Sequence, residues 1–131
     1  MITLPTPQQC LDYFETYKVP ANIKAHCLAV QKVAVLLAEE LRKAGVPINV
    51  ELVRAGAILH DLFKFASLKD ITSTKYHQST FSDAEIAMRN TLRARSPGKY
   101  ENEIAFEIFK DQYPELAVAL RNEGDPHLRQ R

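Results

Sequence analysis

The sequence is short of several residue types, and its few cysteines and its lack of excess basic residues each exclude a class of protein. It has no tryptophan, and its 131 residues include only four glycines and two cysteines. Cys10 and Cys27 are too few for a disulfide framework and lack the spacing of a zinc site, so we expect small buried side chains in a reducing compartment. Lysine and arginine number 17 against 16 acidic residues. The chain therefore lacks the basic excess of a dedicated nucleic-acid-binding protein.

We also see no long apolar run in the sequence. We expect no segment to reach the length of a membrane span, and the N-terminus does not resemble a signal peptide. These absences predict a cytoplasmic protein with no membrane partner. The length of 131 residues fits a single domain, over residues 1–131, that can bury a core of its own.

Helical periodicity runs through almost the whole chain, and no segment alternates as a strand does. Capping signals at Thr6, Asn49 and Ser82 predict helix starts, whereas Gly45 and Pro47 predict a stop. We expect helices over about 7–17, 21–44, 50–63, 82–95, 100–112 and 114–123, with a loop over about 66–80. The predicted fold class is all-α, a compact bundle of five to seven helices.

The second predicted helix carries a nearly continuous apolar stripe. Its members recur at helical spacing, so we expect the stripe to face neighbouring helices; they are His26, Val30, Val33, Leu37 and Leu41.

His60 and Asp61 lie inside an apolar run, residues 55–63. Burying an imidazole beside a carboxylate costs free energy unless something compensates the charge. A divalent metal would do so, because both groups are good ligands for first-row ions. The alternative is a capped helix end, with Asp61 in solvent and His60 as a hydrogen-bonded core residue.

The spacing of the helices brings His26 toward this pair. A short Gly-Val-Pro connection between two helices predicts antiparallel neighbours. His26 lies near the start of the first helix, and His60 and Asp61 lie near the end of the second, so these ends should meet. Two imidazoles and one carboxylate suit a divalent ion and leave positions for water or a substrate oxygen.

Two blocks of the sequence, residues 19–30 and 51–64, resemble the HD-domain metal-dependent phosphohydrolases. The resemblance implies an all-α enzyme in which His26, His60 and Asp61 bind a divalent ion, one of Mn, Mg, Fe, Co, Ni or Zn. That ion would activate water to hydrolyse phosphate esters, commonly nucleotides, with Asp61 orienting the water. Lys64 matches the family's lysine after the His-Asp pair and is expected to contact the substrate phosphate.

The resemblance also shows departures. The family's fourth ligand is an aspartate on a later helix, and the sequence ends at Arg131 about where that segment would begin. The only late aspartate, Asp125, lies in a Gly-Asp-Pro turn. We therefore expect the domain to lack its last helix. An apolar patch left uncovered would favour a homodimer or a swapped oligomer.

A subset of the family holds a second metal with two more histidines, and Glu101 and Glu123 stand at those places here. Either they ligate a second ion, since carboxylates suit Mn, Mg and Fe, or both face solvent in a domain without that second site.

His77 lies in the polar loop, either exposed or as a lid that approaches the substrate. Arg89, Arg93 and Arg95 are expected to form a solvated face or an anion-binding rim.

The sequence therefore predicts hydrolysis of a small phosphorylated substrate, a nucleotide or a related metabolite. The alternative is a catalytically degenerate module of the same fold that binds a ligand or a protein partner. A fold does not fix a function, and the missing fourth ligand is what a decayed site would show.

Overall fold

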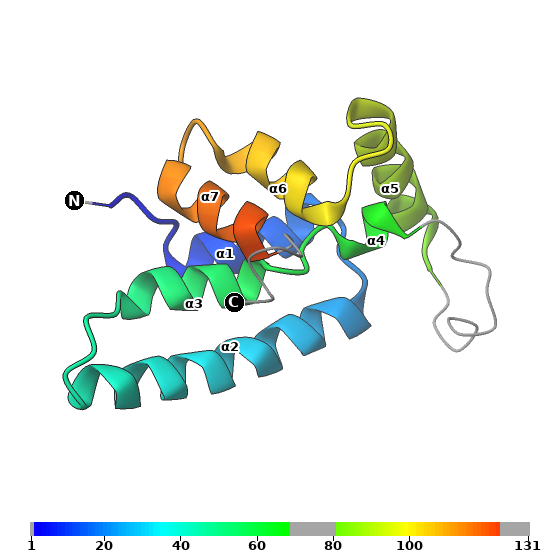
Figure 1. Cartoon of the computed structure of the whole chain (residues 1–131). Helices are drawn as coiled ribbons and strands as arrows, with labels where there is room; N and C mark the ends of the chain where they lie inside the picture. Colours follow the sequence, from blue (N-terminus) through cyan, green and yellow to red (C-terminus); the bar gives the residue numbers. More distant parts are fainter. Residues whose placement is uncertain (1, 69–80, 124–131) are drawn as a thin grey trace.

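The computed structural model describes residues 2–68 and 81–123, and in these ranges all regular structure is helical. The expected all-α bundle is thereby confirmed (Figure 1). Its helices, in chain order, are α1 (Pro7–Thr16), α2 (Ala21–Lys43), α3 (Val50–Leu59), α4 (Lys64–Ser67), α5 (Asp83–Arg95), α6 (Glu101–Phe109) and α7 (Pro114–Glu123).

The capping signals in the sequence set the starts of three helices. At α1 the Thr6 hydroxyl accepts the Gln9 N–H at 3.1 Å, and the Gln9 side chain accepts the Thr6 N–H at 2.8 Å. Ser82 and Glu85 repeat this reciprocal pair at α5, with distances of 3.1 and 2.7 Å. Asn49 caps α3 through its side-chain oxygen. Each cap satisfies N–H groups that a helix start leaves without an intrahelical partner.

The third helix is shorter than predicted. It ends at Leu59, and the chain then turns through His60 and Asp61 before α4 begins at Lys64. The turn is closed by the N–H of Lys64, which donates to the Asp61 carbonyl at 3.1 Å. His60 and Asp61 therefore project from a tight turn between two helices.

The main core lies where α1, α2, α3, α6 and α7 meet. In Figure 1 the α6–α7 pair lies across α3, and α1 passes behind it. The largest fully buried side chains of this core are Phe63, Phe109, Leu59, Ile104, Leu116 and Cys27. Cys10 and Cys27 are both free and buried, as predicted.

α2 and α3 form an antiparallel hairpin, also as predicted (Figure 1). The connection turns at Gly45, whose φ of 94° is one that glycine adopts without steric cost. The far end of the hairpin holds a second, smaller core, separate from the main one. It consists of buried Val35, Ala38 and Val50, with Ile48 and Val53 packed against them.

The predicted packing of the α2 stripe was wrong. The side of α2 that faces the core is formed by Ile23, Cys27, Val35 and Ala38. The stripe itself faces solvent, and its exposed members include Val33, Leu37 and Leu41. α2 is apolar on two sides, and periodicity alone does not tell which of them is covered.

The expectation about segment length was also wrong for α2. This helix has 23 residues and is, by length and composition alone, long and apolar enough to cross a membrane. Core helices of water-soluble proteins pass the same test, and α2 packs along α3. The absence of a membrane partner stays a prediction.

Arg89 and Arg93 form neither a solvated face nor an anion-binding rim, because both bind backbone carbonyls of the α4 segment. Arg93 Nη1 donates to the carbonyls of Ala66 at 2.9 Å and Leu68 at 3.1 Å. Arg89 donates to Phe65 at 3.2 Å and also to Leu68. A four-residue helix leaves most of its carbonyls without an intrahelical donor. The two arginines supply those donors and so attach α4 to α5.

Replacing Arg93 with methionine is expected to lower the free energy of unfolding by about 2 kcal/mol. Methionine keeps the apolar stem but leaves the partly buried Ala66 carbonyl without a charged donor and the Leu68 carbonyl with Arg89 alone. Thermal unfolding of the variant measures the effect. Arg95→Met on the same helix, at an exposed position, is the control and should change stability little. Equal stabilities for the two variants would contradict this role of Arg93.

Candidate metal centre

The start of α2 and the turn after α3 bring His26, His60 and Asp61 together. One ligand atom from each residue lies within 4.8 Å of the others, so the convergence predicted from helix spacing is confirmed. The Nε2 atoms of both histidines are 3.2 Å from Asp61 Oδ2. Asp61 is only 8% exposed, which contradicts the alternative that placed it in solvent.

A backbone carbonyl orients the His60 ring. Its Nδ1 is 2.6 Å from the carbonyl oxygen of Ala57, a contact in which the nitrogen carries the proton and donates. In the neutral ring the lone pair then lies on Nε2, which faces Asp61. A hydrogen bond of this kind on the remote nitrogen is the usual means of orienting a histidine that ligates a metal.

The donor set fits a divalent ion. In the neutral His60 ring, Nε2 and Asp61 Oδ2 are both acceptors, and at 3.2 Å their lone pairs repel unless a cation lies beside them. Ligands about 2.1 Å from a metal are separated by roughly 3.0 to 3.4 Å at octahedral and tetrahedral angles. The two contacts to Asp61 match that spacing. The His26 side chain is 54% exposed against 14% for His60, so the open side of the cluster is at His26.

Positive groups surround Asp61. Burial acts to raise the pKa of its carboxyl. When His60 carries a proton on both ring nitrogens, its hydrogen bond and charge, with the charges of Lys64 and His26, outweigh burial and lower that pKa. Asp61 is therefore ionised at neutral pH. A buried anion between two imidazoles is the charge arrangement that a metal site requires.

Glu101, the first residue of α6, lies next to this cluster. Its Oε2 atom is buried and, within residues 2–68 and 81–123, has no hydrogen-bond partner. Burial and the negative charge of Asp61 raise the pKa of Glu101 from 4.5 to about 7. The alternative in which Glu101 faces solvent is therefore wrong, and a carboxylate with a buried, unpartnered oxygen adjoins the three ligands.

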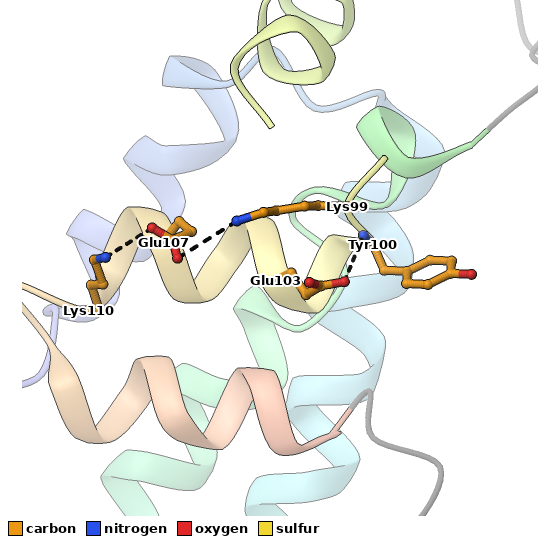
Figure 2. Close-up of polar contacts among 5 residues, drawn as sticks. All are labelled: Lys99, Tyr100, Glu103, Glu107 and Lys110. Carbon is orange, nitrogen blue, oxygen red and sulfur yellow. Dashed lines mark hydrogen bonds and ion pairs between the residues drawn. The ribbon is translucent and has the colours of Figure 1, made fainter. Parts of the chain in front are cut away.

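The remaining charges of α6 lie on its outer side, as Figure 2 shows. The Glu107 carboxylate is 3.0 Å from Lys110 and 3.9 Å from Lys99. The N–H of Tyr100 donates to Glu103 at 3.4 Å, which fixes the start of the helix. With these side chains outside, helical periodicity turns Glu101 inward together with buried Ile104 and Ala105.

Lys64 reaches the same centre, where its charge acts on both Asp61 and Glu101. Two other predicted residues are not placed. Glu123 is the last residue of α7, and its side chain lies outside the described part of the chain. His77 lies in residues 69–80, also outside the described residues.

A recess of about 210 Å³ opens beside the cluster. His26, Asp61 and Lys64 line one part of it, and Phe65 and Phe81 line another. The two phenyl rings pack at a centroid distance of 4.5 Å. Sequence reasoning missed this aromatic wall, because Phe65 and Phe81 lie on opposite sides of the polar loop and share no local spacing.

Comparison with known proteins agrees with the resemblance drawn from residues 19–30 and 51–64. The HD domain family model matches residues 23–127, most of the chain. An uncharacterized protein from the archaeon Methanocaldococcus jannaschii is 46% identical over 41 residues, which cover 31% of this chain and 24% of that protein. The alignment thus spans about a quarter of that relative's length. No solved structure matches the chain significantly.

Proposed function

Because the chain belongs to the HD domain family of metal-dependent phosphohydrolases, we propose that it hydrolyses a phosphate ester at the His26–His60–Asp61 cluster. The observation that carries the proposal is the convergence of two imidazole nitrogens on one buried carboxylate oxygen. The three residues come from two separate segments of the chain. Such a convergence is the arrangement that a divalent ion needs.

The residues around the cluster have distinct roles in the proposed reaction. A bound divalent ion supplies polarisation of a phosphoryl oxygen and lowers the pKa of water. Asp61 accepts a hydrogen bond from the attacking water and so orients it. Lys64 lines the recess beside the cluster and offsets the negative charge of the phosphate.

Glu101 is the proposed fourth protein ligand. Its carboxyl adjoins Asp61, to which it donates a hydrogen bond when protonated, and its buried Oε2 has no other hydrogen-bond partner among the described residues. A buried carboxylate oxygen without a donor is costly unless a cation or proton compensates it. In this role Glu101 supplies a second carboxylate to the ion that Asp61 binds.

The proposed substrate is a nucleotide or a related small metabolite. The recess has a polar part, where His26, Asp61 and Lys64 meet, and an apolar part walled by Phe65 and Phe81. A phosphate at the polar part leaves the organic group of the substrate against the two rings. Aromatic walls suit flat groups such as nucleobases.

An assay panel tests the proposal. Metal-free protein is supplied with Mn, Co, Ni or Mg and given nucleoside mono-, di- and triphosphates. We expect hydrolysis of at least one of these substrates, and loss of that activity on removal of the metal. If the protein binds none of these metals and hydrolyses none of the substrates, the enzyme proposal is wrong, and the ligand-binding module predicted as the alternative takes its place.

Lys64→Met is expected to raise the KM for the substrate about tenfold, because one charged contact to phosphate is lost. The measurement is steady-state kinetics with the metal and substrate found by the panel. Lys110→Met, on the outer side of α6, is the matched control and should leave KM unchanged. Equal KM values for the two variants would show that Lys64 does not contact the phosphate.

A further inference from the structure

The outer face of α2 exposes more large apolar side chains than any other helix in the described part of the chain. Val33, Leu36, Leu37 and Leu41 each leave between 46% and 61% of their surface in solvent. At 3.6 residues per turn their spacing puts them on one side of the helix. We call these four residues the outer patch. A contiguous exposed apolar patch on a globular protein marks an interaction surface.

Two charges beside the outer patch indicate what covers it. Lys32 and Glu39 are seven residues, two helical turns, apart, so they lie on the same edge of α2. The ion pairs found within residues 2–68 and 81–123 involve other side chains. Glu40, for example, is paired with Lys43 at 3.3 Å. One edge of the patch therefore carries one positive and one negative group without an ionic partner in that part of the chain.

We infer that a second copy of this chain covers the outer patch, with the two α2 helices antiparallel about a two-fold axis. In an antiparallel helix pair the same edges face each other, so Lys32 of each copy meets Glu39 of the other. The axis then passes close to Leu36, which packs on Leu36 of the second copy. In that register Val33 lies within one residue of the level of Leu37 of the second copy, so the apolar and the ionic contacts can form together.

The size of the face sets the strength of the association. In this register residues 28–43 of the two α2 helices overlap, a length of about 24 Å, and a strip about 10 Å wide over that length covers about 240 Å² per copy. This area is below that of stable dimers and typical of weak, reversible ones. The dimer is therefore one that forms and dissociates with protein concentration.

Sedimentation equilibrium over about 10 μM to 1 mM protein tests the inference, since weak interfaces dissociate in this range. We expect the average mass of the wild type to rise from monomer toward dimer. Leu36→Asp should weaken the association at least tenfold, because it places a charge at the centre of the interface. Val118→Asp is the matched control: it is an exposed apolar residue, 39% exposed, on a different helix, α7. It should leave the association unchanged.

A charge exchange tests the register. Lys32→Glu and Glu39→Lys should each weaken the dimer, whereas the double variant should restore it, because the opposite charges meet again. Two outcomes would overturn the inference: a wild type that stays monomeric throughout the range, or a double variant no stronger than the single ones. Flotation of a monomeric wild type with phosphatidylcholine–phosphatidylglycerol vesicles would also overturn it and assign the outer patch to a lipid surface.

Discussion

Replacing Asp61 with asparagine is expected to remove the divalent ion from the protein and the hydrolytic activity with it. Asp61 is the carboxylate shared by both histidines at 3.2 Å, and the amide has the same shape without the charge. Removal of a group that only orients a metal ligand costs about 10- to 100-fold in affinity. Loss of a charged ligand should exceed this, so we expect metal affinity and kcat/KM to fall at least about 10³-fold.

Calorimetric titration with Mn²⁺ and analysis of bound metal measure the effect of Asp61→Asn. Circular dichroism establishes that the variant keeps its helices. Asp83→Asn, at an exposed position in the first turn of α5, is the control and should bind metal as the wild type does. Full metal content in Asp61→Asn would show that the cluster is not the metal site.

Glu101→Gln is expected to change stability in opposite directions with and without metal. Without metal, the variant should be more stable than the wild type at pH 8, because the wild type must hold a buried carboxylate near Asp61. With Mn²⁺ the order should reverse, because a ligand that binds only the folded protein stabilises it, and glutamine binds that ion more weakly than glutamate. No such reversal is expected if Glu101 is only a packed residue.

The pH dependence follows from the direction of the pKa shift. The folded protein raises the pKa of Glu101 from 4.5 to about 7. At pH values between these two, Glu101 therefore takes up a proton when the chain folds. The wild type therefore loses stability as pH rises from about 4.5 to 7, and Glu101→Gln does not. Solvent screening reduces the free energy that corresponds to this pKa shift. With that reduction, we expect Glu101→Gln to be more stable than the wild type by about 2 kcal/mol above pH 7 and equally stable at pH 4.

Thermal unfolding in a chelating buffer, from pH 4 to pH 8, measures this difference as a gain of about 7 °C in the Tm of Glu101→Gln at pH 8. Glu115→Gln, at an exposed position in α7, is the matched control and should show no pH-dependent gain. A constant difference between Glu101→Gln and the wild type at all pH values would contradict a raised pKa at Glu101.

The metal cluster could be predicted because its causes are local. A short connection makes α2 and α3 antiparallel, and that alone places His26 opposite His60 and Asp61. The helix starts at Thr6 and Ser82 could be predicted for the same reason, since each cap depends on residues three positions apart.

The features that sequence reasoning missed depend on distant segments. The roles of Arg89 and Arg93 follow from α4, about 25 residues away in the chain, whose carbonyls need donors. The wall formed by Phe65 and Phe81 joins residues on either side of the polar loop. The exposed stripe of α2 reflects which of two apolar sides the other helices reach. None of these contacts has a pattern in the sequence.

The separate small core at the end of the α2–α3 hairpin has a consequence for how the protein opens. Val35, Ala38 and Val50 are the buried members of that cluster, so the C-terminal turns of α2 can come apart from α3 while the main core stays intact. Amide hydrogens there should exchange with solvent through local fluctuations, whereas those around Cys27 and Leu59 should exchange only when the whole domain unfolds. The C-terminal turns of α2 and the end of α2 that carries His26 would then differ in kinetic protection within one helix.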